Sequence, residues 1–433
     1  MKYELTPKDE VFYQLKIVGE PEEIKKEVEL IAKEIRKTAK LPGFRPGKAP
    51  VNIIKKHFAD EIRDALIRTY LPRKVAEVIE KEGLQLLTDP VIEDLKFDAN
   101  TGEFEVSLIL ETKPQIELKK EDYAGIKVKK TTRAVEDKDV ERVIEGLRNQ
   151  LAQWKEVDRE AKEGDLVEIE YETEIEGEEG THKGSVAVVL GQKQLWPEVE
   201  KEVVGKRAGE EGEVEFTAGE DKETYGEAAG KKLKVKFKVK AVKEKEFPEV
   251  NDDFAKKLGF ESLEEMKKRI RDDLEIAEKT REQEEVEDQI IEELLKKVEV
   301  PVPPSLLELE LRAQAENQLR RLAQMGVDVN QLSPQAVFEM VKPTAEKTVK
   351  VKLLLEKVAE LEGIEVSDEE LDEEIQKLAD SLFGGDYVKA RQSLEERGLL
   401  PMIREDVRRQ KALDRLIELA EIEEVKEEES KEE

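Results

Sequence analysis

The segment from Gly43 to Pro50 holds the residues of this chain best suited to contact a large partner. It reads Gly-Phe-Arg-Pro-Gly-Lys-Ala-Pro, and its glycines and prolines are turn-forming residues. Phe44 cannot be buried easily at a loop tip, so we expect an exposed aromatic anchor. Arg45 and Lys48 flank the ring and can pair with phosphates or carboxylates. The segment therefore predicts a cationic contact site that carries one apolar ring.

The region around this segment is positively charged, whereas the chain as a whole is strongly negative. Residues 31–60 contain eight Lys or Arg against Glu34 and Asp60, in a chain whose formal net charge is −30. From composition alone, an ordinary helix–helix connection with surface lysines explains this window equally well. A phosphate-binding loop of the nucleotide type is disfavoured, because the Gly-x₄-Gly-Lys-Ser/Thr spacing is missing.

Composition excludes several classes of protein. The 433 residues predict about two to four domains. Charged residues make up 42%, hydrophobic residues 38% and aromatic residues 5%, which favours several small cores or long helices that each bury a narrow stripe. There is no apolar run long enough for a transmembrane helix and no signal-peptide core. We therefore expect a cytoplasmic protein without a membrane partner.

Catalytic and metal chemistry are also restricted. Cysteine is absent and the two histidines, His57 and His182, lie far apart in the sequence. This argues against disulfides, thiol catalysis and a zinc site. We expect no metal, redox or nucleotide cofactor.

Periodicity divides the chain into regions of different character. Residues 1–112 read as an α/β unit, with strands at 11–18, 91–97 and 104–110 and helices that begin at Pro21 and continue past the loop to Ile79. Residues 113–150 read as a linker that contains a strand at 126–128 and a helix near 135–155. The strand at 232–240 alternates four apolar residues with five lysines, and we interpret this row of lysines as a solvated face.

Residues 247–433 are predicted to be helical throughout. A capping box at Ser262 and Glu265 opens a long helix. The sparse apolar residues predict extended antiparallel arms with grooves between them, and residues 421–433 are predicted to form a frayed acidic tail. Helix breaks are expected at 300–304, Gly326, Pro343, Gly363, 384–385 and Pro401.

The octapeptide at 43–50 resembles the signature of the trigger factor family of bacterial ribosome-associated chaperones, which reads Gly-Phe-Arg-x-Gly-Lys-x-Pro. Every specified position matches. The resemblance extends along the chain. It includes Trp154-Lys155-Glu156, Phe247-Pro248-Glu249-Val250-Asn251, Phe254-Ala255-Lys256-Lys257 and the segment Val298–Pro303.

This resemblance implies a multidomain α+β fold. Residues 1–112 would be an α/β ribosome-binding domain, and 113–150 the linker. Residues 151–246 would be an antiparallel β domain with a short helix, similar to prolyl isomerases of the FK506-binding type. Residues 247–433 would be an all-α domain whose body and two arms form a cradle for nascent chains.

The resemblance also implies the site residues. Gly43, Phe44, Arg45 and Lys48 carry over as contacts to the large ribosomal subunit near the exit tunnel, where the cations would meet rRNA phosphates or an acidic ribosomal protein surface. The isomerase needs no nucleophile, only a dry aromatic pocket that favours the twisted amide. Its candidate residues are Tyr171, Leu195, Trp196 as the floor, Tyr225 as a donor to a substrate carbonyl, and Phe237.

Three positions depart from the family pattern. Gly180 and Val199 stand where the family has aromatic residues, and Glu198 replaces the glycine of a Pro-Gly pair. Burial of a large apolar side chain contributes about 1.5–3 kcal/mol, and two such aromatic side chains are missing from this pocket. We therefore expect weak isomerase activity.

We expect an ATP-independent chaperone that shields nascent or unfolded polypeptides and assists their folding. Basic and acidic stretches on one chain are compatible with a homodimer off the ribosome. One alternative is a free prolyl isomerase chaperone of the periplasmic helical type. Another is a helical scaffold or partner-binding protein with a vestigial, inactive isomerase domain.

Overall fold

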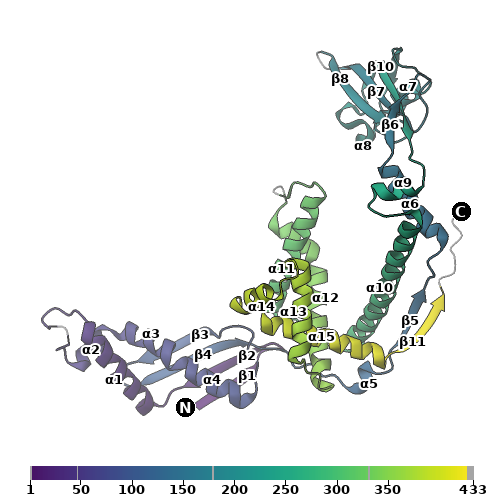
Figure 1. Ribbon diagram of the computed structural model, residues 1–433. Helices are drawn as coiled ribbons and strands as arrows, with labels where there is room; N and C mark the ends of the chain where they lie inside the picture. Colours follow the sequence, from purple (N-terminus) through teal and green to yellow (C-terminus); the bar gives the residue numbers. More distant parts are fainter. Residues whose placement is uncertain (1, 46, 178–179, 330–331, 427–433) are drawn as a thin grey trace. The chain divides into compact units, whose positions relative to one another are not determined.

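The computed structural model describes residues 2–45, 47–177, 180–329 and 332–426 (Figure 1). The chain forms two compact units. One contains residues 1–131 and 283–425, and the other contains residues 132–282 and 426–433.

The first unit begins with an antiparallel sheet and four helices. The sheet order is β1-β2-β4-β3, and the strands predicted near 11–18, 91–97 and 104–110 are confirmed. β1 is an additional edge strand. The elements are β1 (Lys2–Pro7), β2 (Phe12–Val18), α1 (Pro21–Thr38), α2 (Val51–His57), α3 (Ala59–Thr69), α4 (Leu71–Glu82), β3 (Val91–Asp98) and β4 (Glu103–Glu111).

Helix α1 forms where the sequence predicts it. Pro21 occupies its first turn together with acidic residues, and Arg36 and Lys37 lie in its last turn, which suits the helix dipole. Ile24 and Val28 are four residues apart and fully buried. They pack in one core with the inward residues of the sheet.

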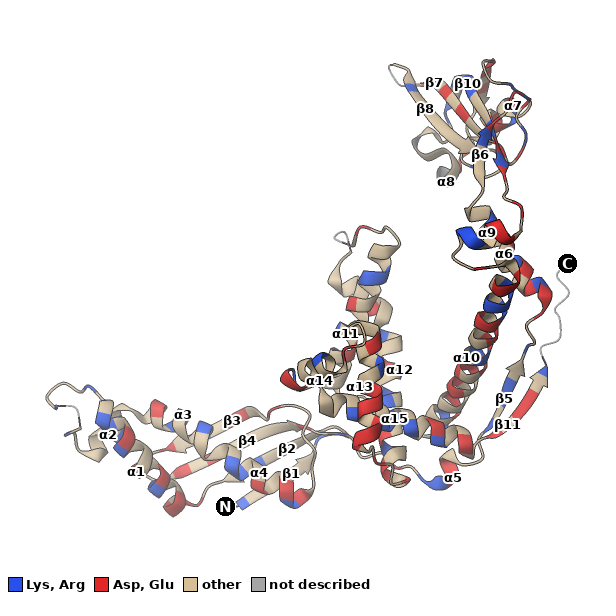
Figure 2. Ribbon diagram, in the orientation of Figure 1, with Lys and Arg blue, Asp and Glu red and all other residues tan. Residues whose placement is uncertain are grey.

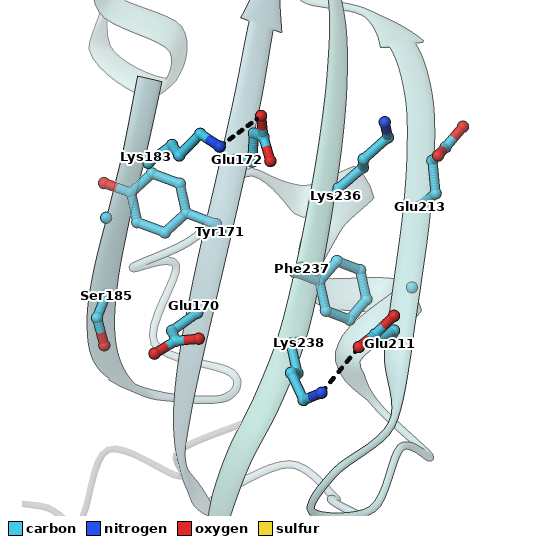
Figure 3. A pocket seen from close by; sticks show the side chains of 12 residues that line it. Glu170, Tyr171, Glu172, Lys183, Ser185, Glu211, Glu213, Lys236, Phe237 and Lys238 are labelled. Carbon is cyan, nitrogen blue, oxygen red and sulfur yellow. Dashed lines mark hydrogen bonds and ion pairs between the residues drawn. The ribbon is translucent and has the colours of Figure 1, made fainter. Parts of the chain in front are cut away.

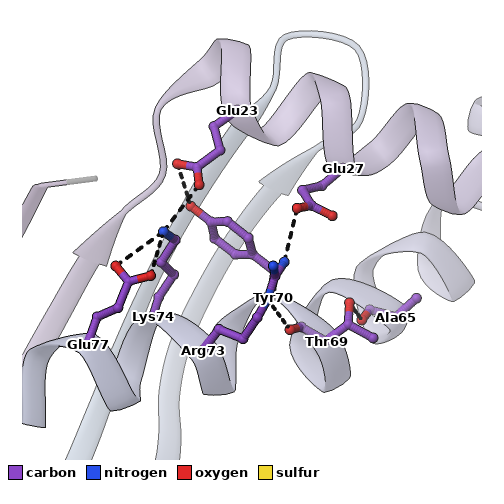
Figure 4. Close-up of polar contacts among 8 residues, drawn as sticks. All are labelled: Glu23, Glu27, Ala65, Thr69, Tyr70, Arg73, Lys74 and Glu77. Carbon is purple, nitrogen blue, oxygen red and sulfur yellow. Dashed lines mark hydrogen bonds and ion pairs between the residues drawn. The ribbon is translucent and has the colours of Figure 1, made fainter. Parts of the chain in front are cut away.

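Tyr70 connects the helices of this domain to the sheet (Figure 4). Its ring is fully buried and meets Phe104 edge-on at 5.7 Å between centroids. Its hydroxyl donates to Glu23 of α1 at 3.1 Å, and Lys74 of α4 pairs with the same carboxylate at 3.2 Å. Burial, and then the nearby Glu23 carboxylate, raise the pKa of Tyr70. A single side chain therefore joins α1, the α3–α4 junction and β4.

The segment after β4 is packed into the helical body. It contains α5 (Lys120–Tyr123) and β5 (Lys127–Thr132). Ile116, Tyr123 and Val128 are buried in a core formed with α10 (Leu263–Lys297), α12 (Pro334–Leu361) and α15 (Leu400–Leu419). Residues 116–128 therefore form part of the body core.

The acidic tail differs from the prediction in part. Glu421–Lys426 forms strand β11, which pairs with β5. The Glu421 N–H donates to the Ile126 carbonyl at 2.8 Å. The prediction of helix followed by a frayed tail was wrong for these residues, because β5 offers backbone partners that no local sequence pattern reveals. Residues 427–433 lie outside the described part of the chain.

Two helical arms extend from the body (Figure 1). Helix α11 (Pro304–Gln324) runs antiparallel to α12, joined by Lys352–Glu310 at 2.7 Å and Gln314–Thr348 at 3.1 Å. The second arm packs α13 (Asp368–Leu382) and α14 (Tyr387–Glu396) against the start of α15 around Ile375. The prediction of antiparallel arms is confirmed.

Helix α12 runs through Pro343 without ending, so the predicted break there was wrong. Proline removes one backbone donor and favours a kink. Val341 and Ala345 on either side are buried against neighbouring elements. We attribute the continuity of the helix to this packing, which sequence periodicity does not reveal.

The second unit contains a sheet of five strands. Its order is β6-β10-β7-β8, with β9 pairing on β10. Asn251 caps α9 through its side chain, which accepts from the Phe254 N–H at 3.0 Å. The elements are α6 (Asp137–Gln150), β6 (Gln153–Glu156), β7 (Leu166–Ile175), β8 (His182–Val189), α7 (Pro197–Val203), β9 (Glu211–Thr217), α8 (Lys222–Tyr225), β10 (Lys232–Glu246) and α9 (Asp252–Lys257).

The lysines of β10 are matched by glutamates on the neighbouring strands. Lys234 pairs with Glu213, and Lys238 pairs with Glu211, each at 2.8 Å. Lys240 pairs with Glu170 of β7 at 2.9 Å. Figure 2 shows the same alternation of sign along α10. The prediction of a solvated lysine face is confirmed, and the structure adds that glutamates of the neighbouring strands neutralise it.

Glu362, just after α12, joins three parts of the body. Its carboxylate accepts from the Tyr123 hydroxyl at 2.7 Å and the Arg415 Nε at 3.0 Å, and pairs with Lys120 at 3.3 Å. These donors, Tyr123 first and then Arg415, lower the pKa of Glu362 from 4.5 to about 2. Because the folded pKa is depressed, the stabilisation is fully present above pH 4.5 and is lost as pH falls through about 2.

We predict that Glu362→Gln lowers the free energy of unfolding by about 1–3 kcal/mol at pH 7. The difference from the unsubstituted chain should shrink below pH 4.5 as its own Glu362 becomes protonated. Urea unfolding followed by the helical circular dichroism signal measures it. Glu339→Gln removes the same charge from an exposed position of α12 and serves as control. Equal effects of the two substitutions would contradict the prediction.

Candidate functional site

The loop between α1 and α2 is built from two successive turns. In the first, Pro42 stands before Gly43, whose φ is 87°, and the Phe44 N–H donates to the Leu41 carbonyl at 3.1 Å. Proline followed by a glycine with positive φ is the pattern of a type II turn. The Pro-Gly pair thus places Phe44 at the end of a short rigid turn.

A second turn follows, displaced by four residues along the chain. Gly47 has φ of 81°, and the Lys48 N–H donates to the Arg45 carbonyl at 3.0 Å. The Gly47 N–H donates to the carbonyl of Arg36 at 2.9 Å. This bond fastens the loop to the last turns of α1. The sequence reasoning did not identify Arg36 as an anchor, because its contribution comes from its backbone.

The side chains of this loop are presented to solvent. Phe44 is 39% exposed, as predicted, and Arg45 and Lys48 are exposed. Within the described ranges, neither cation has an ion-pair or hydrogen-bond partner. By contrast, Lys33 and Lys37 of α1 pair with glutamates on their own helix. Figure 2 shows the loop in blue and tan, and residues 39–50 contain no Asp or Glu.

The β domain contains a cavity of about 860 Å³ on the inward face of its sheet. Tyr171 of β7, Leu195 and Trp196 line it, as predicted. Val199 of α7 lines it at the position where an aromatic residue was expected, and Thr224 of α8 lies at its edge. The cavity is further lined by Glu163, Ile169, Thr173, Val186, Gly191, Lys193, Gln194, Pro197, Glu200 and Val235.

Tyr171 and Phe237 are direct cross-strand partners, yet their rings turn away from each other (Figure 3). Each ring lies over a glycine of the next strand. A Cβ on Gly184 would stand 2.6 Å from the Tyr171 hydroxyl, and a Cβ on Gly212 would overlap the Phe237 ring. The two glycines therefore make room for the rings.

Phe237 is buried in the domain core and lies outside the set of described residues that line the inward cavity. A second, shallower hollow of about 820 Å³ lies among the charged side chains over the same strands (Figure 3). Its lysines and glutamates are largely paired, including Lys183 with Glu172 at 3.0 Å. Phe237 supports the pocket by packing.

Phe216 of β9 is an aromatic residue that the sequence reasoning missed. Its ring lies 6.0 Å from Trp196 at 65°, and 6.5 Å from Tyr225 at 48°. Phe216 thus connects Trp196 with Tyr225. The alternation of Val214 and Phe216 in β9 was the available signal, since both point to the same face.

Tyr225 stands beside the cavity with its hydroxyl engaged. The hydroxyl donates to both carboxylate oxygens of Glu198, at 3.0 and 3.2 Å. Burial and then this hydrogen bond raise the pKa of Tyr225. The predicted donor to substrate is therefore held by Glu198, one of the residues that depart from the family pattern. Gly180 is exposed, with φ of 114°.

The arms present apolar side chains to solvent. Met325 and Met340 on the α11–α12 arm are 72% and 57% exposed. On the second arm, Leu382, Val388 and Met402 are 72%, 73% and 54% exposed. These residues therefore lie on the surface of the arms.

Comparison with known proteins identifies the family of this chain. The model of the bacterial trigger factor protein matches residues 1–147, and that of the trigger factor C-terminus matches residues 262–418. A trigger factor of Aquifex aeolicus is 32% identical over 421 residues, 96% of this chain and 86% of that protein. One of Caldicellulosiruptor saccharolyticus is 30% identical over 418 residues, 94% of each. A solved trigger factor chaperone chain has a TM-score of 0.49 at 23% identity and covers 96% of this chain and 99% of its own.

An exposed cationic loop, a β domain with an aromatic cavity and helical arms with exposed apolar residues define a multidomain chaperone. This chain belongs to the trigger factor family, which is known for prolyl isomerase activity. Its function is that of a ribosome-associated chaperone. In the part of the chain that the structure describes, no helix is long and apolar enough to cross a membrane.

We predict that Gly184→Ala displaces the Tyr171 ring, because the added methyl group would stand within 2.6 Å of its hydroxyl. Overpacking of this kind costs about 1–3 kcal/mol and should lower the melting midpoint of the β domain by about 5–10 °C. Ser185→Ala, at the adjacent exposed position, is the control. An unchanged midpoint in the alanine variant at 184 would show that the ring does not lie over this glycine.

Proposed function

We propose that this chain docks on the large ribosomal subunit beside the exit tunnel through Phe44, Arg45 and Lys48, and there shields emerging polypeptides in the cytoplasm. The observation that supports the proposal is the exposure of three side chains on the loop between α1 and α2. Two turns, with positive φ at Gly43 and Gly47, present the exposed Phe44 ring together with Arg45 and Lys48, two exposed cations that have no partner within the described residues. Gly43 supplies the positive φ of the first turn.

The proposed contact combines two kinds of interaction. Arg45 and Lys48 would pair with rRNA phosphates or acidic side chains of a ribosomal protein, and Phe44 would enter an apolar pocket on that protein. The two hydrogen-bonded turns and the bond from Gly47 to Arg36 restrict the loop, which lowers the conformational entropy lost on docking. An interface this small should be reversible and weaken with added salt.

The proposed client surface is the set of exposed apolar side chains on the two arms, including Met325, Met340 and Met402. Methionine adapts its shape to varied partners. Because these residues stand singly among dense charges, they can hold unfolded chains weakly without forming a patch that drives self-association. The net charge of −30 further favours solubility. Residues 247–433 would thus be the cradle, with no nucleotide required.

We predict that the triple substitution Phe44→Ala, Arg45→Ala and Lys48→Ala abolishes co-sedimentation with large ribosomal subunits at low salt. For the unsubstituted chain, the logarithm of the binding constant should fall by about 0.7–0.9 per phosphate contact for each tenfold rise in salt. Sedimentation of the full chain at several salt concentrations measures both.

Lys267→Ala with Lys268→Ala removes the same number of positive charges from exposed positions of α10 and is the matched control. This variant should sediment like the unsubstituted chain. Binding that survives in the triple variant, or is lost equally in the control, refutes the docking assignment.

A second proposed activity is prolyl isomerisation in the 860 Å³ cavity lined by Tyr171, Leu195 and Trp196. Rotation about an X–Pro bond faces a barrier of about 18–20 kcal/mol. A dry cavity with an aromatic floor disfavours the planar polar amide and accepts the twisted form. We propose low activity, since Val199 replaces a ring in the lining and Glu198 occupies the Tyr225 hydroxyl. Residues 151–246 would form the isomerase domain.

We predict that Trp196→Ala lowers the kcat/KM for a prolyl peptide by about tenfold or more, which corresponds to loss of about 1.4 kcal/mol of transition-state stabilisation. A proline-limited peptide assay on the full chain measures the rate. Trp154→Phe, on strand β6 with its ring under Lys245, should leave the rate unchanged. Absence of activity in the unsubstituted chain would refute the isomerase proposal.

A further inference from the structure

We propose that Glu198 makes this cavity select prolyl peptides that carry a lysine or arginine next to the proline. The inference rests on the isomerase activity proposed above and names its substrate class. From the sequence alone, Glu198 is only a departure from the family pattern that is expected to weaken the pocket. The structure shows that the Glu198 side chain lies in a defined place with a defined partner.

Glu198 lies at the edge of the cavity. It is the second residue of α7, and the residues on both sides of it, Pro197 and Val199, line the cavity. Tyr225, the donor to its carboxylate, directly follows Thr224, which lines the opposite edge. The hydrogen bond between Glu198 and Tyr225 therefore runs from α7 to α8 beside the opening.

Among the described side chains, the Glu198 carboxylate has no oppositely charged partner. The side chain is half-buried, and among the side chains that the structure describes no lysine or arginine pairs with it. Its described partner is the neutral Tyr225 hydroxyl. A partly desolvated anion with a neutral partner gains from an approaching cation more than a fully solvated one does.

The other charged side chains around the cavity also favour a cationic peptide. Glu163 and Glu200 line the cavity, and the described salt bridges include neither of them. Glu200 accepts from the backbone N–H of Gly191 at 2.5 Å. Lys193 is the single cation among the lining residues. Counted over the described side chains, the three carboxylates of Glu163, Glu198 and Glu200 outnumber the one ammonium group of Lys193, so these residues give the opening an excess of negative charge.

The chemistry of a bound peptide places its cation near these groups. A proline ring would enter the apolar part of the cavity against Trp196, and the next Cα lies about 3.8 Å along the chain. A lysine or arginine there extends back over the rim, where its stem packs on apolar surface and its charge meets Glu198. A glutamate at the same position would be repelled.

The test uses the full chain carrying Trp154→Phe, so that Trp196 is the one remaining tryptophan of the two in the sequence. The peptides Ala-Lys-Pro-Ala, Ala-Ala-Pro-Ala and Ala-Glu-Pro-Ala are titrated at low salt while Trp196 fluorescence is followed. The isomerase kcat/KM is measured for the same peptides. The titration reports affinity even where turnover is slow.

We expect the lysine peptide to bind about tenfold more tightly than the glutamate peptide, with the alanine peptide between them. Glu198→Gln should reduce this ratio to about twofold and leave the alanine peptide almost unchanged. Glu202→Gln removes the same charge from an exposed position of α7 and should preserve the full ratio. Added salt should reduce the ratio in the unsubstituted chain.

A ratio that is the same with glutamate or glutamine at position 198 overturns the inference. If all peptides are bound and isomerised equally well, the charge selectivity is wrong while the isomerase proposal stands. If no peptide changes the Trp196 fluorescence and none is isomerised, the isomerase proposal fails, and the selectivity fails with it. Loss of fold in the Glu198→Gln variant is checked by its melting midpoint.

Discussion

Burial of the segment Ile116–Val128 in the helical body is the constraint on which the first unit depends. Its apolar side chains share one core with α10, α12 and α15, and Glu362 holds Tyr123 and Arg415 together at its edge. The chain leaves the N-terminal sheet directly into this core. Lys113 pairs with Glu356 of α12 at 2.5 Å, and the Ser305 N–H at the start of α11 donates to Glu111 of β4. The buried segment, one ion pair and one hydrogen bond thus join the N-terminal domain to the body.

Pairing of charge explains where this molecule can bind partners. Most strands and helices match their charges internally, as the lysines of β10 do with the glutamates of β7 and β9. Single surface pairs contribute little to stability, but together they leave few groups available for other partners. Within the described residues, the side chains of Arg45, Lys48 and Glu198 lack an oppositely charged partner. Arg45 and Lys48 lie on the loop that carries the exposed Phe44, and Glu198 is flanked by two residues that line the cavity. A charge that the fold leaves unmatched, next to an apolar surface, marks a place where a partner can supply both contacts.

The aromatic cavity depends on small residues as much as on large ones. Tyr171 and Phe237 can lie flat because Gly184 and Gly212 stand opposite them. Phe216 then joins Trp196 to Tyr225 across the domain. The resemblance to the trigger factor family implied Tyr171, Leu195 and Trp196 as pocket residues, and all three line the cavity. Sequence reasoning missed Phe216 and the bond from Tyr225 to Glu198, since these contacts join segments of separate strands and helices.

The sequence by itself determined the local structure of this protein. The Pro42-Gly43 pair set the turn before Phe44, the apolar spacing from Ile24 to Ala32 set the buried face of α1, and alternation set the strands. Each of these depends on neighbours only a few residues away. The tertiary structure alone decided whether α12 would end at Pro343, whether Glu421–Lys426 would become a strand, and whether the Tyr225 hydroxyl would be free. In each case the deciding partner lies far away in the chain, or packing outweighs a local preference worth only a few kcal/mol.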